Sequence, residues 1–405
     1  MSAKFAMLQG RCPPEDTYAG AAWWMLVIFV ASIPAEAVLI VPQYGSLTRV
    51  IGALLLVIVT LDFSARGRVW PGSLAVWCAW GFAAWALLSI AWSLEPQAGV
   101  DRAVTYLQLA LMFSVVLAYA DSSKKVDQLL MAYVLGALVI SVSVFINFRA
   151  INFAALAMSD VRVSAFGVNP NEQGLTLVAG LPWAAYFARR HASRLMRLVA
   201  LAAIPCLTLA TILTASRAAF VALAVAGVGM VWMMADARRS AKALAGVVVA
   251  GVALYAYARI PSVTWERLLT TGSNLQRLDL NQRVTAWQAG YQYFADSPFK
   301  GIGTGSFEFA SARVINIERS SHNSYLGVLV ETGVIGACLF GALVACVARA
   351  AVGLQKDLRR AMLATLIPMS LGMFVTGWDY RKVPWLFFAL AIALWRLPRQ
   401  GSRGD

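Results

Sequence analysis

The sequence predicts an all-α polytopic membrane protein with about twelve transmembrane helices. Two observations support this fold class. Hydrophobic residues make up 60% of the 405 residues and charged residues only 13%, whereas a soluble domain carries roughly 25% charged residues. The apolar residues also recur in stretches of about 18 to 22, the length that spans the hydrocarbon core of a bilayer. We therefore interpret the whole chain as one integral-membrane unit.

The individual spans follow the apolar stretches along the chain. They are expected at residues 21–40, 47–64, 73–93, 103–121, 126–147, 171–188, 195–213, 217–235, 240–257, 322–348, 360–377 and 383–397. The chain then divides into three parts. Residues 1–257 hold the first nine spans, residues 258–321 form a large loop, and residues 322–405 hold the last three spans and a tail.

The basic residues between the spans predict the orientation of the chain. Cytoplasmic loops are enriched in Lys and Arg. If the N-terminus is cytoplasmic, every inside segment is basic, as with Lys124 and Lys125, while the short outside loops hold few cations. Both termini are therefore predicted in the cytoplasm of an inner-membrane protein. The same topology explains the net charge of +14 without a nucleic-acid partner, because the cations do not lie on one face of a soluble module.

The five cysteines do not indicate a metal site. They form no CxxC pair, and no histidine stands at ligand spacing from them. No carboxylate cluster suggests a divalent cation either, and no cofactor is predicted. We interpret the cysteines as small core residues.

The large outside loop contains two recognisable stretches. Residues 284–291 carry aromatic side chains at helical spacing, which predicts a helix lying on the membrane interface. Gly301, Gly303 and Gly305 predict a turn-rich loop. This is not a dinucleotide-binding fingerprint, because no strand precedes it and no long helix follows.

His322 is the strongest candidate for a catalytic residue. The chain has two histidines, and His191 lies in a basic inside loop. His322 lies at the outside mouth of a span, and its imidazole can accept and return a proton near neutral pH. The alternative is that this run only caps a helix, a role that Ser and Asn favour. Capping explains the neighbouring serines but not a histidine.

Three arginines are predicted on the same side as His322. They are Arg162, Arg217 and Arg283. Outside loops normally avoid positive charge, and the arginine fork suits phosphate oxygens. The alternative for each is a side chain that reaches the interface along its own stem. The combination of Arg217, Arg283 and His322 favours an anion site.

Two further polar runs adjoin predicted spans. Asn169-Pro170-Asn171-Glu172 has the pattern of a helix start with a capping box, although Asn171 would also bond a sugar or phosphate. Trp378-Asp379-Tyr380-Arg381-Lys382 predicts a tight outside turn. There Asp379 would orient His322 or pair with an arginine. Arg381 and Lys382 would add positive charge for binding phosphate. The alternative is a self-neutralised hairpin with an aromatic belt residue.

Glu331 and Glu36 lie inside apolar spans. On a straight helix, the nine residues between His322 and Glu331 correspond to a rotation of about 900°. The two side chains then face opposite sides, so Glu331 is not expected to contact His322. Carboxylates within membranes usually have a partner or a function, but the sequence does not identify one for either residue.

The order of these motifs resembles the O-antigen ligase and polymerase superfamily. The motifs are Gly167-Val-Asn169-Pro-Asn171, Thr214-Ala-Ser216-Arg217, Arg283-x-x-x-Trp287, Ser297-Pro298-Phe-Lys-Gly301-Ile-Gly303, His322-Asn323-Ser324-Tyr325-Leu326 and Glu331-Thr-Gly333-Val-Ile-Gly336. They cover roughly residues 160–340. The His motif with the upstream Arg-Trp run is fairly specific to the superfamily but does not separate ligases from polymerases.

The resemblance implies a metal-independent, GT-C-like glycosyltransferase of the bacterial inner membrane, active at the periplasmic face. Its donor would be a glycan on undecaprenyl pyrophosphate, and its acceptor in the ligase branch would be lipid A–core. The family's key histidine falls on His322, its loop arginine on Arg283 and a donor-site arginine on Arg217. The residues expected to bind substrate are Arg162, Asn169, Asn171, Asn323, Tyr325, Asp379, Arg381 and Lys382.

Two other functions remain open. A polymerase would use the same donor and a second lipid-linked glycan as acceptor. Such enzymes often have two comparable basic outside loops, and the single dominant loop here favours a ligase. A transporter of an anionic lipid or solute would show inverted repeats and broken helices near the midplane. The sequence shows no internal repeat, and its polar residues gather at one surface.

Overall fold

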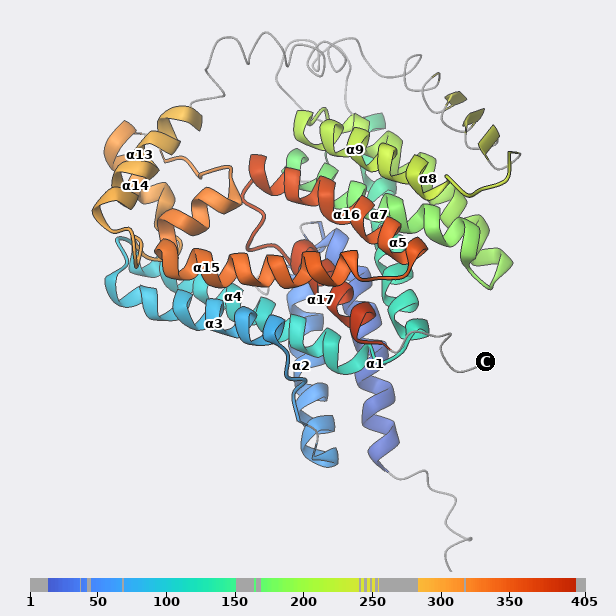
Figure 1. Cartoon of the computed structure of the whole chain (residues 1–405), viewed down its shortest axis with the longest axis horizontal. Coiled ribbons are helices and arrows are strands. Elements are labelled where there is room, and N and C mark those ends of the chain that lie inside the picture. The colour runs from blue at the N-terminus through green and yellow to red at the C-terminus, as the bar shows by residue number, and fades with distance from the viewer. Residues whose placement is uncertain are drawn as a thin grey trace, which may run out of the picture.

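The computed structural model of the chain is almost entirely helical (Figure 1). It describes residues 14–36, 38–41, 45–67, 69–150, 164, 169–239, some residues between 242 and 254, 283–316 and 318–397. The helices are α1 (Pro14–Ser32), η1 (Ile33–Ala35), α2 (Leu47–Arg66), α3 (Leu74–Leu88), η2 (Ser89–Trp92), α4 (Pro96–Tyr119), α5 (Ser123–Ala150), α7 (Pro170–Arg190), α8 (Arg194–Leu213), α9 (Arg217–Met233), α13 (Arg283–Asp296), α14 (Phe307–Ile315), α15 (Ser324–Val352), α16 (Lys356–Val375) and α17 (Lys382–Arg396). Two short strands, β1 (Ile40–Val41) and β2 (Gly45–Ser46), pair antiparallel.

The helices support the predicted class of an all-α polytopic membrane protein. Within the described residues, seven helices are long and apolar enough to cross a membrane: α2, α3 with η2, α4, α5, α8, α15 and α16. Ala19–Ala35 and α9 are shorter apolar helices. Every predicted span except 240–257 overlaps a helix, and that span lies largely outside the described residues. The number twelve stays a prediction.

Local sequence explains where individual helices begin and end. The hydroxyl of Ser46 accepts a hydrogen bond from the N–H of Arg49 (3.3 Å) and so caps α2. The same helix ends at Gly67, which has a left-handed backbone with φ of 58°. Such a glycine terminates a helix because it adopts this conformation without the steric cost of a Cβ.

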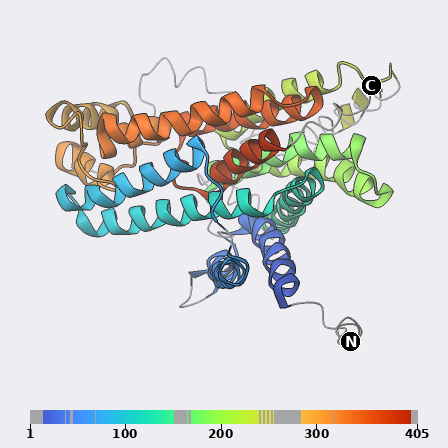
Figure 2. The same cartoon turned by 60° about the horizontal axis from the view of Figure 1, so that its bottom comes forward.

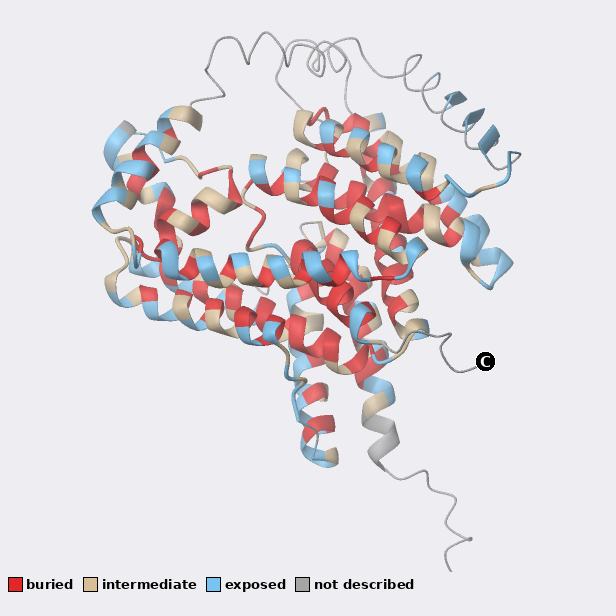
Figure 3. Cartoon of the chain, viewed as in Figure 1, coloured by how far each residue is buried: buried red, intermediate tan, exposed pale blue. Residues whose placement is uncertain are grey.

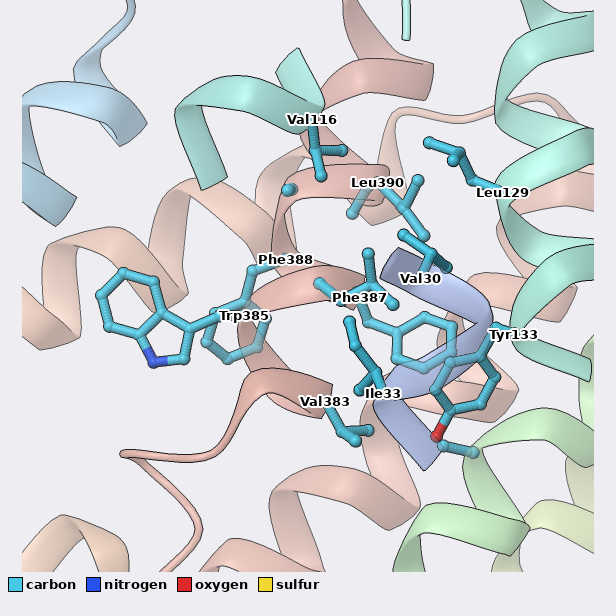
Figure 4. Close-up of a cluster of buried hydrophobic side chains, with 14 of the residues drawn as sticks. Val30, Ile33, Val116, Leu129, Tyr133, Val383, Trp385, Phe387, Phe388 and Leu390 are labelled. Carbon is cyan, nitrogen blue, oxygen red and sulfur yellow. The ribbon is translucent and has the colours of Figure 1, made fainter. Parts of the chain in front are cut away.

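The core of the molecule surrounds α17. Residues Val383 to Leu394 of this helix are all buried, and a helix that is apolar on every side belongs in the interior. Figure 4 shows its side chains among residues of α1, α4 and α5. The ring of Phe387 meets that of Tyr133 edge to face at 4.9 Å between centroids. In Figure 3 the buried residues accordingly concentrate around α17.

Two parts of the chain lie at the periphery of this core. Helices α1 and α2 project from it together, and Figure 2 shows α2 nearly end on beside α1. Helices α13 and α14 lie at one end of the molecule (Figure 1), where they share a small apolar cluster with α15. The helix predicted at residues 284–291 is thus confirmed as part of α13, while its position on a membrane interface stays a prediction.

Helix α15 is broken at Gly333, whose φ of 65° and ψ of −171° are not helical. The loop after α13 fills the break. The N–H groups of Ile302 and Gly303 donate to the carbonyls of Val330 (3.1 Å) and Glu331 (2.9 Å). In return, the carbonyl of Pro298 accepts from Val334 (2.8 Å) and that of Phe299 from Ile335 (3.3 Å). The straight helix assumed from the sequence is therefore wrong here.

Candidate functional site

Hydrogen bonds and an ion pair connect several helix ends around His322, and we call this group of helix ends the His322 end. It is formed by the starts of α7, α9, α13, α15 and α17 and by the turn between α16 and α17. Hydrogen bonds join these elements in sequence. Ser216 donates to the side-chain oxygen of Asn171 (2.8 Å), which joins α9 to α7. Arg381 forms an ion pair with Glu172 (2.8 Å), which joins α7 to the turn before α17.

Ser324 fastens that turn to the start of α15. Its buried hydroxyl donates to the carbonyl of Thr376 (3.0 Å) and accepts from the N–H groups of Trp378 (2.7 Å) and Asp379 (3.1 Å). Buried backbone groups need such partners, because an unsatisfied one costs about 1–3 kcal/mol. Ser324 lies two residues after His322 in the chain, so these bonds hold the turn close to His322.

His322 itself is half-buried and has an unusual backbone conformation, with φ of 45°. Both of its neighbours are fixed. The indole of Trp287 donates to the carbonyl of Ser321 (2.7 Å). Asn323 caps α15, because its side-chain oxygen accepts from the N–H groups of Tyr325 (3.0 Å) and Leu326 (3.1 Å). The imidazole is thus presented from a rigid junction between α13 and α15.

The surroundings of His322 keep its imidazole neutral. Burial, and then the positive charges of Arg283 and Arg319, lower the pKa of His322 to about 4. A neutral imidazole at pH 7 can accept a proton, which is the state that a general base requires. An anion bound nearby would raise this pKa again, because negative charge favours the protonated ring.

Arg283 is half-buried at the first position of α13. Its guanidinium donates to the carbonyl of Val375 (3.1 Å), the last residue of α16. Burial lowers the pKa of Arg283 from its usual value, but an arginine stays protonated at neutral pH. One positive charge is therefore fixed between α13, α16 and His322.

Arg217 is the first residue of α9 and is also half-buried. Ser216 caps this helix by accepting from the N–H of Ala219 (3.2 Å). The preceding residue, Ala215, has a positive φ of 48°. Helix starts favour anions because their N–H groups and dipole present positive charge, and the side chain of Arg217 adds to that charge. Arg162 lies outside the described residues.

The turn between α16 and α17 is not self-neutralised. Asp379 is 4% exposed and accepts a hydrogen bond from the hydroxyl of Tyr106. It also interacts electrostatically with Arg102. Of the two roles predicted for Asp379, the structure therefore favours pairing with an arginine. Lys382 bonds to Glu36 of the turn after η1, which gives Glu36 the partner that the sequence did not identify.

The remaining predicted binding residues hold the site together. Asn169 caps α7 by accepting from the N–H of Asn171 (2.9 Å), as predicted, and Pro170 occupies the first turn. Glu172 pairs with Arg381 across the site. The hydroxyl of Tyr325 donates to the carbonyl of Ser370 on α16 (3.4 Å). Contacts of these residues with a substrate stay predictions.

Sequence reasoning missed Arg102 and the role of Glu331. Glu331 is buried, and its carboxylate accepts from the N–H groups of Gly305 (2.9 Å) and Phe307 (3.2 Å). It also interacts with the charge of Arg102, whose guanidinium lies 3.6 Å from the ring centre of Tyr380. The predicted span at residues 103–121 leaves Arg102 in an outside loop, but Arg102 lies in the second turn of α4. The signal for Arg102 in the sequence was its position as a lone arginine in an outside segment.

Comparison with known families finds one similarity, which covers part of this chain. The family model described as O-antigen ligase matches residues 198–341. This stretch includes Arg217, Arg283 and His322. No curated protein matches the chain significantly.

Proposed function

The match to residues 198–341 supports membership of the O-antigen ligase and polymerase family, and we propose that the protein is a ligase of lipid-linked glycans. It transfers a glycan from undecaprenyl pyrophosphate to the lipid A–core oligosaccharide at the periplasmic face of the bacterial inner membrane. The observation that carries this proposal is the state of His322. It is a neutral, half-buried imidazole held in a strained backbone beside Arg283.

In the proposed reaction, His322 removes the proton of an acceptor hydroxyl. The oxygen attacks the anomeric carbon of the donor, the bond from that carbon to the pyrophosphate oxygen breaks, and undecaprenyl pyrophosphate leaves. A single displacement inverts the configuration at the anomeric carbon. The proton on His322 then passes to solvent or to the leaving group. A positioned general base typically accelerates such a step about 10²- to 10⁴-fold.

The arginines stabilise the charge that grows on the leaving group. Arg217 and Arg283 are both half-buried at helix starts, so their charges are fixed before the reaction. Removing one fixed donor aimed at developing charge typically costs about 2.7–4 kcal/mol of transition-state stabilisation. Arg381 and Lys382 lie on the adjoining turn and would add positive charge there.

Reconstitution tests the proposal. The purified full-length protein is supplied with undecaprenyl-pyrophosphate-linked glycan and lipid A–core. Glycan transfer to lipid A–core is expected for the native protein and loss of transfer for His322→Ala. His191→Ala is the matched control, because His191 lies after α7, where its ring nitrogen accepts from the N–H of Ser193 (3.0 Å). It should retain transfer.

Two results would contradict the ligase. Elongation of the lipid-linked glycan without transfer to lipid A–core would identify a polymerase. If folded native protein formed neither product with competent substrates, the enzyme assignment would fail, and a lipid-binding or transport role would become the next hypothesis to test.

A further inference from the structure

Two buried carboxylates, Glu331 and Asp379, lie close enough to influence each other. Glu331 is 5% exposed and Asp379 is 4% exposed. Glu331 belongs to α15, just before the break at Gly333, and Asp379 belongs to the turn between α16 and α17. The two side chains interact electrostatically. Charges in the interior of a protein are usually paired, because removing a charge from water without a partner is costly.

One arginine interacts with both carboxylates. Arg102, in the second turn of α4, interacts electrostatically with Glu331 and with Asp379. Its guanidinium also lies 3.6 Å from the ring centre of Tyr380, the residue after Asp379. A planar guanidinium that stacks on a ring is held in one orientation more firmly than a flexible ammonium. Arg102 is therefore a cation shared by two elements, α15 and the turn before α17.

Glu331 holds a loop on one side of Arg102. Its two carboxylate oxygens accept from the N–H groups of Gly305 (2.9 Å) and Phe307 (3.2 Å). This loop lies so close to α4 that a Cβ at Gly305 would be 2.5 Å from the carbonyl oxygen of Ala98 and 3.3 Å from the Cβ of Arg102. The loop that fills the break in α15 thus continues into a segment that lies directly against Arg102.

Asp379 holds the turn on the other side of Arg102. Its carboxylate accepts from the hydroxyl of Tyr106, which lies four residues after Arg102 in α4. The N–H of Asp379 donates to the hydroxyl of Ser324 (3.1 Å), two residues after His322. A displacement of Asp379 would therefore be passed to the start of α15, where His322 is presented.

We infer that Arg102 is a positioning residue, which keeps the turn at residues 376–381 beside His322 by balancing the charges of Glu331 and Asp379. Without the guanidinium, two like charges would repel each other with no cation shared between them, and the turn would move away from α15. The inference itself concerns the position of the turn. Its consequence for the rate of glycan transfer rests on the proposed function.

Backbone hydrogen exchange in the full-length protein tests the position of the turn without any glycan transfer. Mass spectrometry of proteolytic fragments compares the native protein with Arg102→Gln. The N–H groups of residues 378 and 379, which bond to Ser324, should exchange at least about tenfold faster in the variant, the factor that corresponds to losing one interaction with a charged group. Fragments of α5 should exchange as in the native protein, which distinguishes local loosening from unfolding.

Arg313→Gln is the matched control for this exchange. Arg313 of α14 also lies over an aromatic ring, 4.6 Å from the ring centre of Phe309, but its side chain is exposed. The control variant should leave both the exchange of residues 378 and 379 and glycan transfer unchanged.

A second substitution tests charge balance as the cause. Arg102→Gln combined with Glu331→Gln removes one charge of each sign, and the glutamine oxygen at position 331 still accepts hydrogen bonds. The exchange of residues 378 and 379 should return most of the way to the native rate. Arg102→Lys, which keeps the charge without the planar stack, should lie between Arg102→Gln and the native protein.

The kinetics of glycan transfer should follow the exchange. In Arg102→Gln, kcat should fall about 10²-fold, the cost of a displacement of about 1 Å at a reacting centre, and KM should change less. The double variant should recover most of the lost kcat. A role in stability alone would not predict this recovery, because the double variant removes more native interactions than the single one.

Native exchange at residues 378 and 379 in Arg102→Gln would overturn the inference, and so would a double variant that exchanges as fast as Arg102→Gln. If Arg102→Gln does not fold, the double variant decides, since native-like exchange supports the inference and fast exchange overturns it. If the native protein transfers no glycan but the exchange changes as expected, the proposed function fails and the inference stands. If the native protein transfers glycan and Arg102→Gln keeps the native exchange and kcat, the inference fails and the proposed function stands.

Discussion

His322 occupies a left-handed backbone conformation, with φ of 45°. A residue with a Cβ pays roughly 1–2 kcal/mol for this conformation, and such strain tends to persist where the surrounding structure serves a function. Ala215, two residues before Arg217, is strained in the same way, with φ of 48°. His322 is itself a predicted catalytic residue, and Ala215 lies close to another, Arg217.

This strain leads to a prediction about stability. His322→Gly should be more stable than His322→Ala by about 1 kcal/mol in the free energy of unfolding, because glycine adopts positive φ without the Cβ cost. It should therefore unfold at a higher temperature. Both variants should lose glycan transfer. Thermal unfolding of the two purified proteins in the same detergent measures the difference. Equal stability would show that the backbone at this position is not strained.

The charges around His322 predict a pH dependence. Burial, Arg283 and Arg319 lower its pKa to about 4, so the native protein should lose kcat/KM only as the pH falls through about 4, where the base becomes protonated. Arg283→Gln removes a positive charge, raises the pKa of His322 and should move this acidic limb to higher pH. The measurement is the pH profile of kcat/KM.

Arg319→Gln is the comparison for that profile. It also removes a positive charge that acts on His322, but a weaker one than Arg283. The acidic limb should therefore move in the same direction by less, and more of the plateau rate should remain. A limb that stays in place in both variants would mean that His322 is not the titrating base.

The sequence identified side chains whose residue type is unusual at their position. It did not identify side chains whose residue type is common there, such as a serine at a helix start. His322, Arg217 and Arg283 were noticeable as a histidine and arginines on the outside of a membrane protein, and all three lie at the His322 end. Ser324 was not, because a serine beside a helix start predicts only a cap. Its bonds to residues 376–379 depend on contacts between distant parts of the chain, which periodicity does not reveal.

At the scale of elements, the break in α15 depends on one glycine. A Cβ at Gly333 would lie 2.3 Å from the carbonyl oxygen of Phe299, and its φ of 65° disfavours any other residue. The freed backbone groups are satisfied by the loop that carries Gly301 and Gly303. Non-helical backbone at membrane depth is tolerated only where protein or water supplies such partners.

Gly333→Ala should therefore destabilise the protein by at least about 1–3 kcal/mol, through backbone strain and the close contact. Gly341→Ala lies in the same helix with no neighbouring atom within 4 Å, and it should be neutral or stabilising by about 0.5–1 kcal/mol. Chemical unfolding of both variants measures the contrast. Equal effects would contradict the packing described for the break.

The boundaries of most helices could be predicted because apolar length and caps are local signals, as Ser46 and Gly67 show for α2. The broken helix could not. The run around Gly333 reads as a continuous apolar span, and small residues in such spans usually indicate close helix packing. What decides the break is the loop at residues 298–303, which lies outside the span.

At the scale of the whole molecule, stability depends on α17. Phe387 is fully buried, whereas Trp395 of the same helix is 46% exposed. Phe387→Ala should lower the stability of the protein by about 3 kcal/mol or more, because it removes a packed ring and leaves a cavity. Trp395→Ala should have a small effect. Thermal unfolding compares them, and equal losses would show that α17 is not the centre of the fold.

The pairs that close the His322 end join residues far apart in the chain, and this sets the order in which the protein can be assembled. Tyr106 and Asp379 are 273 positions apart, and Glu36 and Lys382 are 346 apart. The break in α15, by contrast, is closed by a loop about thirty residues upstream. Chains emerge from the ribosome N-terminus first, so the broken helix can be completed while synthesis continues. The candidate site is complete only after the final helix has been inserted, because Asp379 and Lys382 supply one partner of each long-range pair.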